Sequence, residues 1–206
     1  MAVNMTKEIN CMLLKSGLPL YERAVMVAAA AHSGMTRKGT GIPYLSHPVE
    51  AASIVAEMTD DQELIAAAVL HDVVEDTEVT AQELEEMFGA RVAHYVACET
   101  ENKRRDLPPE STWKLRKQET ITFLKEKADR NARKLALADK LSNLRSIERD
   151  LNSIGDRIWQ RFNQKDKAMH GWFYRQIAEA LRELEEYPAW QEYDRLIRNV
   201  FEKDSI

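Results

Sequence analysis

Apolar residues recur at helical spacing along nearly the whole chain, and no segment alternates with the period of a β-strand. The clearest case is residues 129–150, where Leu137, Leu141, Leu144 and Ile147 form one apolar stripe. Gly and Pro, with 7 and 6 copies among 206 residues, are too scarce for an all-β design with many turns. The sequence therefore predicts an all-α fold, a bundle of about ten helices.

Start and stop signals divide this pattern into separate helices. The stretch 46–48, "SHP", is typical of a helix start with Pro near the first helical position. Thr80 and Glu83 have the spacing of a capping box, and Asp106–Ser111 is expected to be a break. Within a single domain over residues 1–206, we expect helices at 20–33, 46–58, 80–89, 90–102, 112–127, 129–150, 165–187 and 189–203. A further helix is expected to begin at Asp60–Asp61 and to lead into the stretch at residues 69–78. The last two are amphipathic, and we expect them to pack against each other.

Composition excludes several classes of protein. A net charge of −5, without a long basic block, argues against a binder of nucleic-acid polymers. The longest apolar run, residues 24–31, is far shorter than the roughly 20 residues that span a bilayer. Cys11 and Cys98 fit no metal or redox spacing, and the first residues lack the apolar core of a signal peptide. We therefore expect a cytoplasmic protein without a membrane partner, and a homo-oligomer stays open.

The stretch "VLHDVVEDTE" at residues 69–78 combines histidine and carboxylates directly after an apolar helix. His71 and Asp72 are adjacent, and Glu75 and Asp76 follow one helical turn later, so the two acidic groups point to one side if the helix continues. Imidazole with carboxylate suits a divalent cation such as Mn²⁺, Fe²⁺, Zn²⁺ or Mg²⁺. A solvated helix end is the competing interpretation.

A second polar group lies off the apolar stripe of residues 129–150. Asp139, Asn143 and Ser146 share one face of that helix, and Lys140 and Arg145 flank them. The face is either an ordinary exposed surface or part of a site. Three other histidines are expected to have packing or surface roles: His32, His94 and His170.

In combination, His47, the His71–Asp72 pair and Asp139 resemble the H…HD…D signature of the HD-domain metal-dependent phosphohydrolases. The segments "RKGTGIPYLSHP", "HDVVEDT", "FGARV" and "LALADKLSNLRSI" are similar to the hydrolase domain of RelA/SpoT-type alarmone enzymes, over about residues 20–150. Those enzymes remove the 3′-pyrophosphate of ppGpp and pppGpp. The resemblance implies an all-helical HD-domain bundle, Mn²⁺ dependence with other divalent metals open, and a stand-alone small alarmone hydrolase.

The resemblance also implies roles for individual residues. Four positions match the family's metal ligands: His47, His71, Asp72 and Asp139. Glu75 and Asp76 match the acidic pair assigned to the nucleophilic water, which a carboxylate can orient and deprotonate. Positions near the nucleotide are matched or flanked by a further set: Arg37, Lys38, Asn143, Ser146, Lys140 and Arg145.

One departure concerns the loop after Lys38. This chain has four residues, "GTGI", before Pro43, where the long bifunctional enzymes typically have three. Two alternatives to ppGpp hydrolysis therefore stay open. One is hydrolysis of another nucleotide or phosphorylated cofactor, and the other is a non-catalytic nucleotide-binding module. The acidic pair and Asp139 argue against the second alternative.

Overall fold

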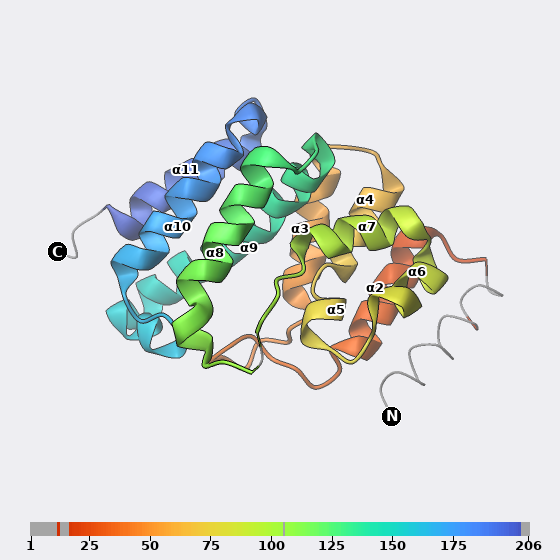
Figure 1. Ribbon diagram of the computed structural model, residues 1–206, viewed down its shortest axis with the longest axis horizontal. Helices are drawn as coiled ribbons and strands as arrows, with labels where there is room; N and C mark the ends of the chain where they lie inside the picture. Colours follow the sequence, from red (N-terminus) through yellow and green to blue (C-terminus); the bar gives the residue numbers. More distant parts are fainter. Residues whose placement is uncertain (1–11, 13–16, 105, 203–206) are drawn as a thin grey trace. The chain divides into compact units, whose positions relative to one another are not determined.

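A computed structural model describes residues 12, 17–104 and 106–202 of the chain. It divides the chain into two compact units, Met1–Thr100 and Glu101–Ile206. Both units are helical (Figure 1), and the described residues contain no β-strand, only an isolated antiparallel bridge between Thr36 and Pro43. The predicted all-α class is confirmed.

The first unit is built around helix α4. Its helices are α2 (Leu20–Ala31), α3 (Ser46–Ala56), α4 (Gln62–Leu70), α5 (Val73–Asp76), α6 (Ala81–Phe88) and α7 (Ala90–Glu99). Helix α4 packs against α2, α3 and α7, and every residue from Leu64 to Leu70 is buried. The central "AAA" of this helix explains the close packing, because small side chains let neighbouring helices approach.

The beginning of α4 is fixed by polar contacts. Asp61 is its N-cap and accepts hydrogen bonds from the backbone N–H groups of Glu63 and Leu64. Arg91 of α7 forms ion pairs with Asp61 and with Glu63, the latter at 2.6 Å. Helix α4 is thus tied to α7 at one end, and its other end leads directly into His71.

Helix α6 begins with the predicted capping box. The Thr80 hydroxyl accepts from the Glu83 backbone N–H at 3.2 Å, and the Glu83 carboxylate accepts from the Thr80 backbone N–H at 3.0 Å. The helix ends at Gly89, whose φ of 88° lies in the left-handed region that favours glycine. Both boundaries of this helix are confirmed.

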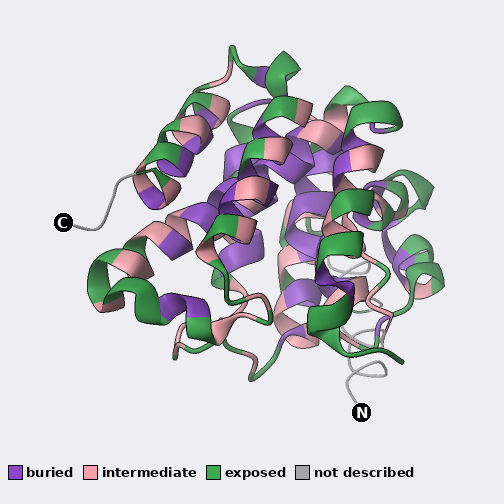
Figure 2. Cartoon of the chain, turned by 60° about the vertical axis from the view of Figure 1, so that its left-hand side comes forward, coloured by how far each residue is buried: buried purple, intermediate pink, exposed green. Residues whose placement is uncertain are grey.

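The second unit has two long helices and several short elements. They are α8 (Pro109–Glu126), α9 (Arg130–Ile154), the 3₁₀ helix η1 (Gly155–Arg161), α10 (Lys167–Ala180), the 3₁₀ turn η2 (Arg182–Leu184) and α11 (Pro188–Phe201). Helix α11 packs on α9 and on α10, so the expected contact between the last two helices is confirmed. Apart from the fully buried body of α4, most helices of both units present buried positions on one side and exposed positions on the other (Figure 2).

Three boundaries in the second unit differ from the prediction. The break expected over Asp106–Ser111 is wrong in its second half, because Pro109 is the first residue of α8, a position that tolerates the missing N–H of proline. Helix α9 continues beyond residue 150 to Ile154 and ends at Gly155, whose φ is 62°. The helix expected over 165–187 ends at Ala180 and is followed by η2.

No helix in the described part of the chain is both long and apolar enough to cross a membrane. Cys98 carries a free thiol. Cys11 lies outside the described residues, so the expectation about its pairing stays a prediction.

Candidate functional site

Two buried histidines face one carboxylate oxygen in the first unit. His47 lies in the first turn of α3, and His71 and Asp72 follow the last residue of α4. The Nε2 atoms of His47 and His71 lie 3.6 and 3.2 Å from Oδ2 of Asp72, and the two imidazole rings are 5.1 Å apart. The His71 Nδ1 atom is 2.8 Å from the Ala68 carbonyl, which places the ring proton on Nδ1 and the lone pair on Nε2. Two imidazole nitrogens and a carboxylate oxygen therefore form a donor set that suits a divalent cation.

The chain bends between the two halves of the "HDVVEDTE" stretch. Helix α4 ends at Leu70 and α5 covers only Val73–Asp76, so the helix does not continue unbroken through this stretch. The backbone N–H of Asp76 still donates to the Asp72 carbonyl at 2.9 Å, which keeps the spacing of one helical turn. The side chains of Asp72 and Asp76 consequently point to the same side, as expected.

One tyrosine hydroxyl joins these two carboxylates. Oη of Tyr44 lies 2.7 Å from Oδ2 of Asp72 and 2.6 Å from Oδ2 of Asp76. Burial is the largest cause that raises the pKa of Tyr44 above its ordinary value, and the charges of Asp72 and Asp76 raise it further. The hydroxyl therefore keeps its proton and acts as a hydrogen-bond donor.

The ring of Tyr44 is held by two neighbours. The His32 ring stacks on it at 4.8 Å with an interplanar angle of 18°, and the Arg37 guanidinium carbon lies 5.5 Å from its centroid. His32 Nδ1 is 3.0 Å from the Ala28 carbonyl, and burial is the main cause that lowers the pKa of His32. His32 is thus a buried, neutral packing partner of Tyr44, which agrees with its expected packing role.

The loop after α2 presents the two basic residues predicted to bind the nucleotide. The Arg37 backbone N–H donates to the Ile42 carbonyl at 2.8 Å, and the Arg37 carbonyl accepts from the Thr40 backbone N–H at 3.0 Å. Gly39 between them has a φ of 71°, a conformation that glycine adopts without strain. The four-residue "GTGI" segment is thus an ordered turn, with Arg37 half-buried and Lys38 exposed.

The predicted carboxylate of the second unit is buried. Asp139 is only 6 % exposed, which contradicts the interpretation of its helix face as an ordinary exposed surface. Asn143 donates to Oδ1 of Asp139 at 2.6 Å, and the Lys140 ammonium pairs with the same carboxylate. Ser146 is half-buried on the same helix.

Arg145 is engaged by the C-terminal helix. Its guanidinium donates to both carboxylate oxygens of Glu192 of α11, at 3.0 and 2.6 Å. These hydrogen bonds are the largest cause that lowers the pKa of Glu192. The structure therefore gives Arg145 a contact within the second unit, and its predicted contact with a nucleotide stays a prediction.

Two of the predicted nucleotide contacts border a cavity of about 180 Å³ in the second unit. Lys140 and Asn143 of α9 line it, together with Lys117 of α8. The remaining lining is aromatic or apolar: Trp113, Ile147, Phe162, His170, Phe173 and Tyr174. Lysines and an amide beside aromatic rings suit a ligand that carries both phosphate and a planar base.

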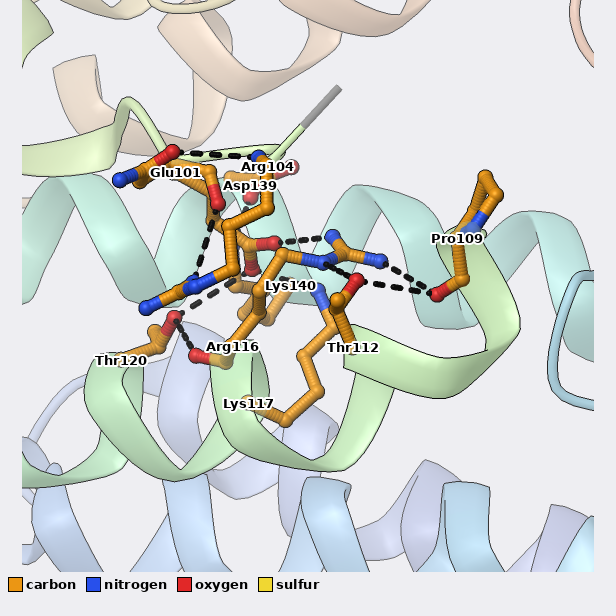
Figure 3. Close-up of polar contacts among 10 residues, drawn as sticks. Glu101, Arg104, Pro109, Thr112, Arg116, Lys117, Thr120, Asp139 and Lys140 are labelled. Carbon is orange, nitrogen blue, oxygen red and sulfur yellow. Dashed lines mark hydrogen bonds and ion pairs between the residues drawn. The ribbon is translucent and has the colours of Figure 1, made fainter. Parts of the chain in front are cut away.

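A half-buried carboxylate, that of Glu101, fixes Lys117 at this cavity (Figure 3). Glu101 accepts from Arg116 at 2.7 Å and from Lys117 at 2.6 Å, and the Thr120 hydroxyl is 3.3 Å away. Burial raises the pKa of Glu101, but the charges of Lys117, Lys140 and Arg116 outweigh it and lower the pKa to about 2. Glu101 is therefore an anion at any physiological pH, and it holds two cations of α8 in place.

The predicted site residues are divided between the units. The first unit contains Arg37, Lys38, His47, His71, Asp72, Glu75 and Asp76, and the second contains Asp139, Lys140, Asn143, Arg145 and Ser146. A single site that uses both sets of residues stays a prediction. The sequence did not single out Tyr44, Glu101 or Lys117, although Tyr44 belongs to the quoted "PYLSHP" segment.

Curated relatives and solved structures are similar to parts of this chain. The Escherichia coli bifunctional (p)ppGpp synthase/hydrolase SpoT is 46 % identical over 88 residues, which are 43 % of this chain and 12 % of that protein. A Haemophilus influenzae guanosine-3′,5′-bis(diphosphate) 3′-pyrophosphohydrolase is 51 % identical over 71 residues, which are 34 % of this chain and 10 % of that protein. The matches thus span only a small part of these relatives.

Two solved structures cover most of the chain. The Listeria monocytogenes protein lmo0812 has a TM-score of 0.67 and 34 % identity, over 80 % of this chain and 99 % of that one. A metazoan ortholog of SpoT, described as hydrolysing ppGpp, has a TM-score of 0.71 and 24 % identity, over 88 % of this chain and 96 % of that one. The latter likeness shows a shared fold.

One family profile matches a range that contains predicted site residues of both units. The HD domain profile matches residues 24–167, a range that includes the two histidines, the acidic pair and Asp139. This match extends over well more than half of the chain and agrees with the helical fold. The chain belongs to the HD domain family.

Proposed function

We propose that this protein hydrolyses the 3′-pyrophosphate of ppGpp and pppGpp, releasing GDP or GTP and pyrophosphate, with Mn²⁺ as its cofactor. The observation that carries the proposal is that the Nε2 atoms of His47 and His71 both face the carboxylate of Asp72. The Tyr44 hydroxyl contacts this carboxylate and that of Asp76. The small nucleotide substrate is supported by the names of the E. coli and H. influenzae relatives.

The donor set fits a divalent metal. Membership in the HD domain family implies such an ion. Imidazole with carboxylate accepts several divalent metals, and Mn²⁺ is the proposed choice because the resemblance to RelA/SpoT-type hydrolases implies it. His47, His71 and Asp72 provide three ligands, and Asp139 of the second unit is the proposed fourth. When bound, the ion lowers the pKa of a coordinated water and offsets phosphate charge.

The acidic pair performs the proton transfer in this proposal. Glu75 and Asp76 orient the attacking water and accept its proton, while the water oxygen bonds to the phosphorus attached to O3′. The bond between that phosphorus and O3′ breaks, and O3′ takes up a proton. Arg37 stacks on the base, whereas Lys38, Lys140 and Asn143 contact phosphate or base, with Ser146 and Arg145 beside them.

The decisive experiment is product analysis after incubation with ppGpp and Mn²⁺. We expect GDP and pyrophosphate in equal amounts and no turnover with EDTA. ATP, GTP and a panel of phosphorylated cofactors form a second arm, which tests the alternative raised by the four-residue turn at residues 39–42. Turnover of that panel with ppGpp untouched would overturn the proposed substrate.

Matched variants test the assigned carboxylate. Asp72→Asn is expected to lower kcat at least 100-fold, because it removes a ligand charge beside both imidazoles. Asp60→Asn, the same change at an exposed aspartate of the same unit, is the control and should leave kcat unchanged. A wild-type protein that binds nucleotide but shows no turnover with any divalent metal would support a non-catalytic module.

A further inference from the structure

We propose that Tyr44 is a positioning residue that sets the orientations of Asp72 and Asp76 through one shared hydroxyl. The inference rests on the proposed function where it concerns turnover, but its first test is metal binding alone. Without these contacts, Tyr44 would be regarded only as a packing residue of the loop between α2 and α3. The geometry that carries it is the contact of a single Oη atom with two carboxylates, at 2.7 and 2.6 Å.

The same carboxylate oxygen takes part in both groups of contacts. Oδ2 of Asp72 is the atom that faces Nε2 of His47 and of His71, and it is also the atom that contacts the Tyr44 hydroxyl. A hydrogen bond to that oxygen fixes the rotation of the carboxylate. Groups that hydrogen-bond to a metal ligand in this way orient the ligand and increase the affinity of the site for the metal.

A hydroxyl has only one proton, so Tyr44 can donate fully to only one of the two oxygens at a time. Both carboxylates are drawn to that proton, which offsets the repulsion between two negative groups held close together. The proton can alternate between the two oxygens, so the hydroxyl holds both carboxylates at a fixed spacing. Tyr44 would thus keep Asp72 turned toward the two imidazoles and Asp76 in place for the proposed water.

The ring is fixed well enough for this role. The Tyr44 backbone N–H donates to the Met35 carbonyl at 2.9 Å, and the His32 ring stacks on the Tyr44 ring with 4.8 Å between their centroids. Arg37, proposed to contact the base, lies 5.5 Å from the ring centroid. Tyr44 therefore connects the loop that is proposed to bind the nucleotide with the carboxylates that are proposed to bind the metal and the water.

The test compares Tyr44→Phe with Tyr95→Phe. Both changes remove one hydroxyl from a tyrosine of the first unit, and Tyr95 also has an arginine, Arg91, 5.5 Å from its ring centroid. The phenylalanine at position 44 keeps the stacking surface for His32 and Arg37, so only the hydrogen bonds are lost. Thermal melting of both variants establishes that they are folded.

The first measurement is titration of the metal-free protein with Mn²⁺ by isothermal calorimetry. We expect Tyr44→Phe to weaken binding about 10- to 100-fold, the range typical of residues that orient metal ligands. Tyr95→Phe should bind within twofold of the wild type. Equal affinity of Tyr44→Phe and the wild type would overturn the inference.

The second measurement separates positioning from simple packing. At saturating Mn²⁺, we expect Tyr44→Phe to lower kcat for ppGpp at least 10-fold with KM changed less than threefold. In an Asp76→Asn background, Tyr44→Phe should have a clearly smaller effect, because the hydroxyl acts partly through that carboxylate. Full additivity of the two changes would contradict a role through Asp76.

The outcomes distinguish this inference from the proposed function. If Tyr44→Phe weakens Mn²⁺ binding but the wild type does not hydrolyse ppGpp, the positioning role stands and the proposed substrate is wrong. If the wild type hydrolyses ppGpp and Tyr44→Phe is equal to it in Mn²⁺ affinity and kcat, the proposed function stands and the positioning role is wrong. A wild type that binds no divalent metal would overturn both.

Discussion

Burial and charge act in opposite directions on Glu101. Removal of water disfavours the carboxylate, but Lys117 and Arg116 donate to it at 2.6 and 2.7 Å, and the net effect lowers its pKa from 4.5 to about 2. A shift of this size corresponds to on the order of 3 kcal/mol between the two protonation states. At the scale of single residues, this carboxylate is therefore a structural anion that keeps Lys117 beside the cavity.

The shift predicts a dependence of stability on pH. Because the folded pKa is below the unfolded value, the contribution of Glu101 is fully present above pH 4.5 and is lost as the pH falls toward 2. Glu101→Gln is expected to lower the free energy of unfolding at pH 7 by about 2 to 3 kcal/mol, since it leaves two partly buried cations without their anion. The difference from the wild type should shrink between pH 4.5 and 3.

Urea denaturation at pH 7, 5, 4 and 3 measures this effect. Glu119→Gln is the control, because Glu119 also pairs with an arginine, Arg104, but is 49 % exposed. That change should cost less than about 0.5 kcal/mol, as is usual for surface ion pairs. A Glu101→Gln variant whose stability parallels the wild type at every pH would contradict the assigned cause.

At the scale of elements, the helices of the first unit depend on the polar groups at their ends. Asp61 caps α4 and also binds Arg91 of α7, whereas Thr80 and Glu83 cap α6 reciprocally. Helix α6 has only eight residues, too few to be stable alone, so its capping box and its packing on α7 must maintain it.

The capping box gives a direct prediction for α6. Thr80→Ala removes the side-chain acceptor for the Glu83 backbone N–H and should lower the free energy of unfolding by about 1 kcal/mol. Thr80→Ser keeps an acceptor oxygen and should cost much less. Chemical denaturation of both variants measures the difference; equal losses would mean that packing of the threonine methyl group, not the hydrogen bond, is responsible.

Sequence patterns predicted the helices better than they predicted the site. Periodicity and capping signals located α2, α3, α6 and α11 within a few residues, because these depend on local chemistry. Whether the helix continues past His71 and Asp72 was left open by the sequence, since it depends on what surrounds the end of α4. The roles of Tyr44 and Glu101 were also missed, because their partners are distant in sequence or become important only through burial.

At the scale of the whole molecule, the HD domain match crosses from the first unit into the second. The proposed ligands follow the same division, with Asp139 alone in the second unit. A metal that binds only the folded protein stabilises it in proportion to the logarithm of metal concentration over Kd. Ligation by Asp139 can therefore be tested without substrate.

We expect Mn²⁺ to raise the melting temperature of the wild type and EDTA to reverse the rise. If Asp139 is the fourth ligand, Asp139→Asn should remove most of the Mn²⁺-dependent rise. Asp156→Asn is the control, since Asp156 is an exposed aspartate of the same unit. Differential scanning fluorimetry at several Mn²⁺ concentrations gives the result, and an undiminished rise in Asp139→Asn would exclude Asp139 from the ligand set.

Helix α4 is fixed at its beginning and buried along its body, and this limits how proteins of the HD domain family can differ in length. Arg91 holds its first turn, its body is buried on every side, and His71 follows its last residue. One residue inserted in α4 would rotate His71 by about 100° and move it away from its neighbours. In the turn at residues 39–42 the two glycines are exposed and the other two residues are half-buried, and the turn closes by its own hydrogen bonds. Insertions and deletions among relatives should therefore accumulate in that turn and be absent from α4.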